Sequence, residues 1–180
     1  MSETRMAIRR IVKFGDPVLS TPTETITEIT GEIRDLVGDM VETMYAAPGV
    51  GLAANQIGLS LRLAVIDVTA GQEPGRLITL INPTIIEQEG RQVEEEGCLS
   101  VPGFTEFVVR PARAVVKALD IDGKELVMEG RELLARAFCH EIDHLDGKLF
   151  LDRLGGIKRQ LMLKRVKRAT RNGAWDDVYP

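Results

Sequence analysis

The chain has 180 residues, of which 44% are hydrophobic and 28% charged, with a formal net charge of −4. This composition excludes a disordered or fibrous protein, and the apolar runs are far shorter than the roughly 20 residues of a membrane span. The first ten residues hold no apolar core of signal-peptide length, so we expect a cytoplasmic protein with a single domain over residues 1–180.

The predicted elements begin with an irregular arm over the first thirty residues, where short apolar runs alternate with turn residues. From position 33 to position 44, apolar residues recur at the i, i+3, i+4, i+7 spacing of one helix face. Thr30 fits the N-cap of this helix, and Pro48 and Gly49 should end it. The stretch over 49–58 is rich in Gly and Ala and predicts a loop.

Apolar runs in the middle of the chain predict strands over 61–68, 77–81, 104–109, 114–121 and 124–128. Asp122 and Gly123 separate the last two runs, and Asp-Gly in this position favours a hairpin. From Glu132 the pattern becomes helical until Gly147, and a last helix is predicted over 157–171. A helix, then hairpin-linked strands, then helices indicates an α+β fold with mostly antiparallel sheets.

The segment His140-Glu-Ile-Asp-His144 is an H-E-x-x-H motif inside the second predicted helix. Residues four apart share a helix face, so both imidazoles can bind one metal ion. Glu141 is then close enough to act as general base toward a metal-activated water. The chain has only these two histidines, which favours a metal site over the alternative of two exposed or core histidines.

A catalytic metal site of this kind needs a third protein ligand. Residues 153–175 contain no Asp or Glu, which excludes a downstream carboxylate, and Phe150 stands where a metzincin would have its third histidine. Cys139 is turned about 100° from His140 around the helix and fits a small buried hydrophobe better. Cys98 remains, either as the third ligand or as a buried thiol. One thiolate and two imidazoles suit Zn²⁺, Fe²⁺, Co²⁺ or Ni²⁺.

Three segments together resemble the signature motifs of the bacterial peptide deformylases, namely Gly49-Val-Gly-Leu-Ala-Ala-Asn-Gln-Ile-Gly58, Glu96-Gly-Cys-Leu-Ser100 and His140-Glu-Ile-Asp-His144. The resemblance extends from about Ile11 to at least Leu151. It implies an α+β enzyme whose antiparallel sheets pack around a central H-E-x-x-H helix, with a further helix at the C-terminus. The implied reaction is hydrolysis of the N-formyl group from the initiator methionine of nascent chains, which releases formate. The implied cofactor is one divalent metal ion, Fe²⁺ in cells, which Zn²⁺, Ni²⁺ or Co²⁺ can replace.

The resemblance also assigns roles to individual residues. The metal ligands that it implies are Cys98, His140 and His144. Glu141 would be the general base, while the Gln56 amide and the backbone N–H of Leu99 would donate to the oxygen of the formyl group. Gly51 would approach the substrate through its backbone. Taken alone, the Gly- and Ala-rich stretch fits a tight connection between a helix and a strand equally well.

Two residues on the metal-facing side of the second helix, Leu133 and Ala137, fit the lining of a pocket for a methionine side chain. Plain core packing explains each of them equally well. Arg136 and Cys139 stand beside them, where related enzymes often carry an apolar residue and Gln respectively.

Glu96 lies in a run of three glutamates, where a solvated side chain is the simplest interpretation. As the glutamate of the second motif, it should instead be partly buried. Arg110 is the partner that we expect for it.

Residues 153–172 contain eight Lys or Arg and no Asp or Glu, so a basic tail over 153–180 follows an acidic body. This tail is either a solvated helix face or a surface that docks on ribosomal RNA near the nascent chain, as resembling enzymes do. We expect a monomer with a formyl-methionyl nascent peptide as substrate and no membrane partner.

Two other functions stay open from the sequence. A metallopeptidase that cuts internal bonds is disfavoured by the missing downstream ligand and by the motif around Cys98. A nucleic-acid-binding module with a structural metal is disfavoured by the acidic body, by the 4% of aromatic residues and by the count of three ligands.

Overall fold

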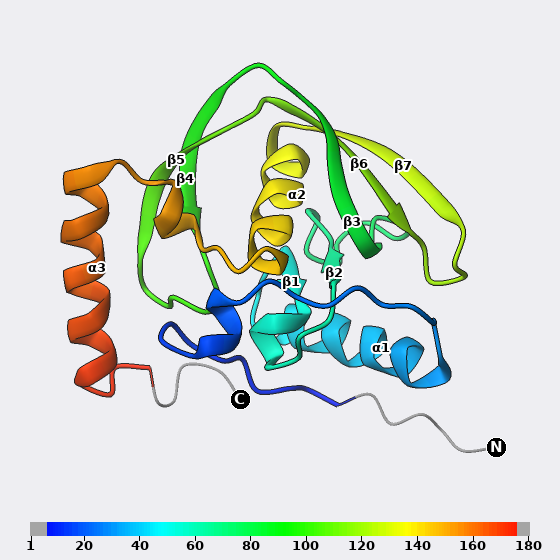
Figure 1. Cartoon of the computed structure of the whole chain (residues 1–180), viewed down its shortest axis with the longest axis horizontal. Helices are drawn as coiled ribbons and strands as arrows, with labels where there is room; N and C mark the ends of the chain where they lie inside the picture. Colours follow the sequence, from blue (N-terminus) through cyan, green and yellow to red (C-terminus); the bar gives the residue numbers. More distant parts are fainter. Residues whose placement is uncertain (1–6, 176–180) are drawn as a thin grey trace.

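The structure is a computed structural model that describes residues 7–175, and it places one helix at the centre of two antiparallel sheets (Figure 1). The helices are α1 (Gly31–Ala46), α2 (Glu132–Leu145) and α3 (Gly156–Arg171), and the 3₁₀ turns are η1 (Pro17–Ser20), η2 (Ala54–Ile57) and η3 (Phe150–Arg153). The strands are β1 (Gly51–Ala53), β2 (Leu63–Ile66), β3 (Ile78–Glu89), β4 (Gln92–Gly97), β5 (Thr105–Arg110), β6 (Arg113–Leu119) and β7 (Glu125–Arg131).

The larger sheet has the strand order β1-β2-β3-β6-β7, and all its neighbouring strands run antiparallel. The smaller sheet is the antiparallel pair β4–β5. The predicted hairpin is present, because Asp122 and Gly123 connect β6 to β7 and Gly123 has a φ of 78°. These features confirm the expected α+β fold with mostly antiparallel sheets.

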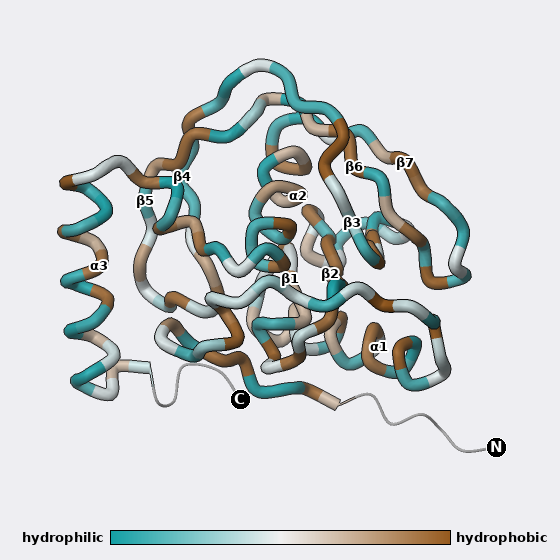
Figure 2. The backbone as a smooth tube through the Cα atoms, in the orientation of Figure 1, coloured by the Kyte–Doolittle hydropathy of each residue, from teal (hydrophilic) through white to brown (hydrophobic). Residues whose placement is uncertain are grey.

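Helix α1 covers one side of the larger sheet. Thr30 caps it as predicted, with its Oγ1 accepting a hydrogen bond from the Ile33 N–H. Met40 and Met44 are fully buried in a cluster with residues of β1 and β2. Figure 2 shows hydrophobic and hydrophilic residues alternating along this helix, which is typical of a surface helix with one buried face.

The central helix α2 packs against the sheet through Phe138 and Ile142. Helix α3 begins within one residue of its predicted start and packs on the side of the β4–β5 sheet (Figure 1). Its buried residues Met162 and Val166 share a cluster with Trp175, whose indole N–H donates to the carbonyl of Pro102. Within the described residues, none of the helices has the length and apolarity that a membrane crossing requires.

Three segments differ from the sequence prediction. The Gly- and Ala-rich stretch is not a simple loop, because it contains β1 and η2. Strand β3 is twelve residues long and continues well past the apolar run over 77–81. Strand β4 was not predicted, because the glutamates over 94–96 lack strand propensity. The ladder to β5 and the ion pair of the largely buried Glu96 side chain with Arg110 outweigh this propensity.

Candidate metal centre and active site

Three side chains that the sequence predicts as metal ligands converge on one point. Cys98 directly follows β4, and His140 and His144 lie one turn apart on α2. The Cys98 Sγ lies 3.2 Å from His144 Nε2, which lies 3.1 Å from His140 Nε2. All three atoms lie within 4.8 Å of one another. Because one sulfur and two ring nitrogens point at each other, the donor set fits a divalent ion such as Zn²⁺ or Fe²⁺.

Glu96 fixes the orientation of the first histidine. The Nδ1 of His140 lies 2.5 Å from the Glu96 Oε1, so Nε2 is the ring nitrogen that faces the other two ligand atoms. Burial would raise the pKa of Glu96, but hydrogen bonds from His140 and Arg110 lower it to about 2. The expected partner of Glu96 is confirmed, since Arg110 Nη2 lies 2.5 Å from its carboxylate.

Arg110 also connects the site to Asp143, which the sequence analysis did not single out. Its Nη1 donates to Asp143 Oδ2 at 2.6 Å, and Arg153 donates two further hydrogen bonds to the same carboxylate. Burial would raise the pKa of Asp143, but the hydrogen bond from Arg153 and the charge of Arg110 hold it below its ordinary value. The position of Asp143 between the two histidines is the only sequence signal for this role.

Asn55 supports the second histidine. Its Nδ2 donates to the backbone carbonyl of His144 at 2.5 Å. Within the described residues, Asn55 Oδ1 and His144 Nδ1 are buried and have no hydrogen-bond partner. Burial, with the charge of His140 adding to it, lowers the pKa of His144 well below its ordinary value. The neutral imidazole is the form that binds a metal ion.

Glu141 lies next to the ligands and is only 4% exposed as a residue. Burial raises its pKa to about 7, and its Oε2 has no hydrogen-bond partner among residues 7–175. Gly51 of β1 faces this carboxylate so closely that a Cβ on Gly51 would lie 2.8 Å from the Glu141 Cδ and would overlap Oε1. The glycine therefore makes room for Glu141.

Gln56 approaches the ligands from η2. Its Oε1 accepts from the Ala53 N–H at 3.0 Å, and this bond directs Nε2 toward the Ser100 Oγ at 3.2 Å and the Cys98 Sγ at 3.6 Å. Ser100 was not singled out from the sequence, although it ends the second motif. Gln56 is buried, so its amide is held in one orientation beside Cys98.

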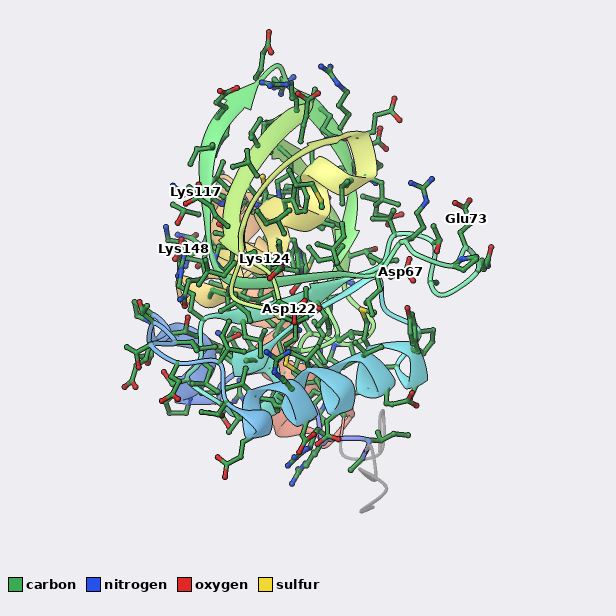
Figure 3. The ribbon with its side chains drawn as sticks, turned by 90° about the vertical axis from the view of Figure 1, so that its right-hand side faces the viewer. Asp67, Glu73, Lys117, Asp122, Lys124 and Lys148 are labelled. Atoms are coloured by element: carbon green, nitrogen blue, oxygen red, sulfur yellow. The ribbon has the colours of Figure 1, made fainter. Side chains whose placement is uncertain are left out.

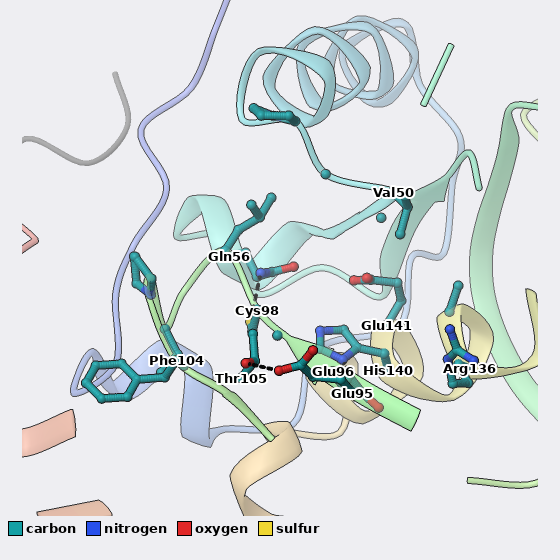
Figure 4. A pocket seen from close by; sticks show the side chains of 18 of the residues that line it. Val50, Gln56, Glu95, Glu96, Cys98, Phe104, Thr105, Arg136, His140 and Glu141 are labelled. Atoms are coloured by element: carbon teal, nitrogen blue, oxygen red, sulfur yellow. Dashed lines mark hydrogen bonds and ion pairs between the residues drawn. The ribbon is translucent and has the colours of Figure 1, made fainter. Parts of the chain in front are cut away.

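A cavity of about 380 Å³ opens onto these residues. Figure 4 shows His140 and Glu141 in its middle, with Phe104 toward one side and Arg136 toward the other. Its lining includes every residue that the sequence predicts for the site except His144, which lies buried behind it: Gly51, Gln56, Cys98, Leu99, Leu133, Ala137, His140 and Glu141. Val50, which belongs to the first motif, also lines it, as do Pro102 and Phe104, which have no sequence signal of their own.

Cys139 lies away from this cavity, as its place on the helix predicts. It is buried and packs with Ala114 and Ala135. Burial raises the pKa of its thiol to about 11, so it stays protonated. The expectation of a small buried hydrophobe is confirmed.

Comparison with known proteins gives one consistent result. The polypeptide deformylase family matches residues 8–160. The peptide deformylase of Acidobacterium capsulatum is 55% identical over 170 residues, which covers 94% of this chain and all of that protein. The peptide deformylase of Thermodesulfovibrio yellowstonii is 50% identical, with 90% of this chain and 98% of that protein covered.

Solved structures of peptide deformylases are similar to the structure of this chain. The crystal structure of a peptide deformylase from Legionella pneumophila matches with a TM-score of 0.86 and 43% identity, over 94% of this chain and 99% of that chain. A peptide deformylase from Ehrlichia chaffeensis in complex with actinonin matches with a TM-score of 0.84 and 40% identity, over 92% and 99%. This chain therefore belongs to the polypeptide deformylase family, a family of hydrolases that remove N-formyl groups from nascent peptides.

Proposed function

We propose that this chain hydrolyses the N-formyl group from the N-terminal formylmethionine of nascent polypeptides in a metal-dependent reaction, with Glu141 as general base. One observation carries the proposal. A buried carboxylate with a pKa of about 7 lies next to three converging ligand atoms, at the wall of a cavity. A base of this pKa can both accept and return a proton near neutral pH.

Cys98, His140 and His144 would hold one divalent ion. Fe²⁺ is the ion that we propose for the cell, with Zn²⁺, Ni²⁺ or Co²⁺ as substitutes, since all of them accept this mixture of sulfur and nitrogen ligands. Such an ion supplies two things, a lower pKa for water and polarisation of a carbonyl oxygen.

The chain's own residues then move the protons and hold the developing charge. Glu141 takes the proton of the attacking water, whose oxygen forms a bond to the formyl carbon. The amide Nε2 of Gln56 and the backbone N–H of Leu99 donate to the formyl oxygen as it becomes negative. Glu141 returns the proton to the amine nitrogen when the carbon–nitrogen bond breaks, which yields formate and a free amino terminus.

The cavity wall supplies the substrate contacts in this proposal. The backbone of Gly51 lines the cavity, so the peptide can approach it closely. Leu133 and Ala137 contribute apolar wall on α2, which fits the side chain of a methionine.

The decisive test is formate release from N-formyl-Met-Ala-Ser by protein purified without oxygen and loaded with Fe²⁺ or Ni²⁺. We expect the wild type to release formate rapidly. Glu141→Ala should keep the metal and lose turnover, and Cys98→Ala should lose most of the metal affinity. If the wild type binds one metal per chain and releases no formate, the substrate is not a formyl peptide and the proposal is wrong.

We also propose that α3 docks on ribosomal RNA. Lys164, Lys167 and Arg171 line a shallow groove along this helix, and cations on one face suit a phosphate backbone. Deletion of the helix would expose the cluster around Met162 and Val166, so charge reversal is the cleaner test. Replacing Lys164, Lys167 and Arg171 together by glutamate should weaken ribosome binding and reduce its dependence on salt, while the turnover of short peptides stays unchanged. The control Lys117→Glu should change neither the ribosome binding nor the turnover.

Every residue of the site comes from one chain, so a monomer with one domain over 1–180 suffices for the activity. The ends of this range, 1–6 and 176–180, lie outside the described residues. We place the protein in the cytoplasm because its proposed substrate, a nascent formylated chain, is made there.

A further inference from the structure

Arg136 places a guanidinium at the wall of the active-site cavity. It lies one helical turn before His140 on α2 and is half-buried. Figure 4 shows it on the far side of His140 and Glu141 from Phe104. Long side chains on a helix lean toward its N-terminus, so the guanidinium is directed away from the ligands and toward Gln92, which bonds the first residue of α2.

The partner of Arg136 is a neutral amide. Its Nη1 donates to Gln92 Oε1 at 3.1 Å, and no carboxylate among residues 7–175 forms an ion pair with it. Arg110, by comparison, contacts Glu96 and Asp143, so the other arginine close to the ligands is fully neutralised.

Gln92 is itself held in place. Its Nε2 donates to the carbonyls of Pro111 at 2.8 Å and of Glu132 at 2.9 Å, which leaves Oε1 directed at Arg136. The guanidinium is therefore oriented in advance, while most of its five N–H groups remain available to a ligand. Preorganised donors of this kind bind carboxylates better than a mobile side chain does.

The proposed reaction makes no use of this cation. A formylated amino terminus carries no charge, and the roles of Glu141, Gln56 and Leu99 account for the proton and the oxyanion. Three carboxylates also line the cavity, and none of them forms an ion pair with Arg136. Glu95 accepts a hydrogen bond from the Thr105 hydroxyl at 2.6 Å, Glu96 is paired with Arg110 and His140, and Glu141 is the proposed base. A half-buried cation without a counter-ion in a peptide-binding cavity is explained by a negative charge on the peptide.

We propose that Arg136 is a specificity-determining residue, which binds a carboxylate on the first or second residue after the formylmethionine. The inference rests on the proposed function and narrows its substrates toward acidic formyl peptides. The carboxylate of the peptide would accept charge-assisted hydrogen bonds from the Arg136 guanidinium. It would play the part for Arg136 that the Glu96 carboxylate plays for Arg110.

The test compares kcat/KM for matched peptides with amidated C-termini. The pairs are formyl-Met-Asp-Ser against formyl-Met-Asn-Ser, and formyl-Met-Ala-Asp against formyl-Met-Ala-Asn, so that charge changes and shape does not. We expect a preference for Asp of about tenfold at one of the two positions, which is the size of one hydrogen bond to a charged group. Arg136→Met should reduce the ratio to about one, and Arg136→Lys should retain part of it. Arg131→Met removes an exposed arginine outside the cavity and should keep the full preference.

Two results would overturn the inference. One is a wild-type ratio near one at both positions. The other is an Arg136→Met variant that slows all four peptides by the same factor, which would make Arg136 a support for Gln92 and β4 only. Formyl-Met-Ala-Ser amide, which carries no carboxylate, distinguishes failure of the Arg136 inference from failure of the proposed function. If it releases formate while the ratios are flat, only the role of Arg136 is wrong, and if it releases none with metal bound, the proposed function is wrong as well.

Discussion

Arg110 donates to both carboxylate oxygens of Glu96, from Nε at 3.1 Å and from Nη2 at 2.5 Å. Glu96 in turn holds the ring of His140, so the guanidinium acts on a proposed metal ligand through one intermediate residue. Arg110 is 3% exposed, and its third bond goes to the buried Asp143. Two buried carboxylates therefore share one buried cation, and Asp143 has Arg153 as a second partner.

Arg110→Met should destabilise the fold strongly. The substitution fills a similar volume but leaves Glu96 and Asp143 without their shared partner, and breaking a buried ion pair in this way costs about 3–5 kcal/mol. Unfolding in urea measures the loss. The control is Arg34→Met, which removes an exposed pair with Asp122 (labelled in Figure 3) and should cost below about 1 kcal/mol. Similar losses for both variants would show that the buried network adds no stability.

Gly51→Ala should abolish turnover while the metal site remains. A Cβ at this position would overlap Oε1 of Glu141, so the proposed general base would have to leave its place beside the ligands. Formate release and metal content of the purified variant measure the two effects. Gly31→Ala is the matched control, because a Cβ there meets no atom within 4 Å and the helix begins at that residue. An active Gly51→Ala enzyme would mean that Glu141 tolerates displacement.

The predictable parts of the site depend on local geometry. The i, i+4 spacing of His140 and His144 places both on one face of α2, and the side of the helix taken by Cys139 follows from the same periodicity. The cap at Thr30 is local in the same sense, because its hydroxyl bonds a backbone N–H three residues on. Patterns of this range are visible in a sequence without knowledge of the fold.

The parts that could not be predicted depend on contacts between distant segments. The sequence of β4 is typical of an exposed acidic segment rather than of a strand. The strand forms because it pairs with β5 and because Glu96 bonds Arg110 and His140. Gln92 and Arg136 are 44 residues apart in the chain, and no spacing rule connects them. Polar side chains that face the core need their partners in place, and these partners come from the tertiary structure.

Metal removal should lower the thermal stability of the enzyme. The three proposed ligand atoms lie within 4.8 Å of one another in the native state, so an ion bound there would stabilise the fold by mass action, by about 2.7 kcal/mol at a free concentration one hundred times Kd. Melting temperatures with Ni²⁺ and after chelation measure the difference. Cys98→Ala should show a much smaller difference, while Cys139→Ala, away from the ligands, should show the full one. An unchanged melting temperature in the wild type after verified loss of the metal would contradict the native-state site.

The contact between Tyr45 and Asp67 should make stability depend on alkaline pH. The Tyr45 hydroxyl donates to Asp67 Oδ2 at 2.6 Å, and Asp67 also accepts from the N–H groups of Thr69 and Gly71. The hydrogen bond to Asp67, with burial adding to it, raises the pKa of Tyr45 from 10.0 to about 12. Since the native state holds this proton more tightly than the unfolded chain does, the contribution is complete below pH 10 and is lost as the pH rises from 10 to about 12.

Tyr45→Phe isolates this contribution, because it keeps the ring and removes the hydroxyl. The difference between the free energies of unfolding of the wild type and of Tyr45→Phe should stay constant from about pH 8 to pH 10. It should then decrease steadily toward pH 12, because the unfolded wild-type chain gains stability by losing the Tyr45 proton first. Urea unfolding in steps of half a pH unit measures this difference. A difference that stays level across the alkaline range would show that Tyr45 titrates alike in both states and that its bond to Asp67 adds nothing to folding.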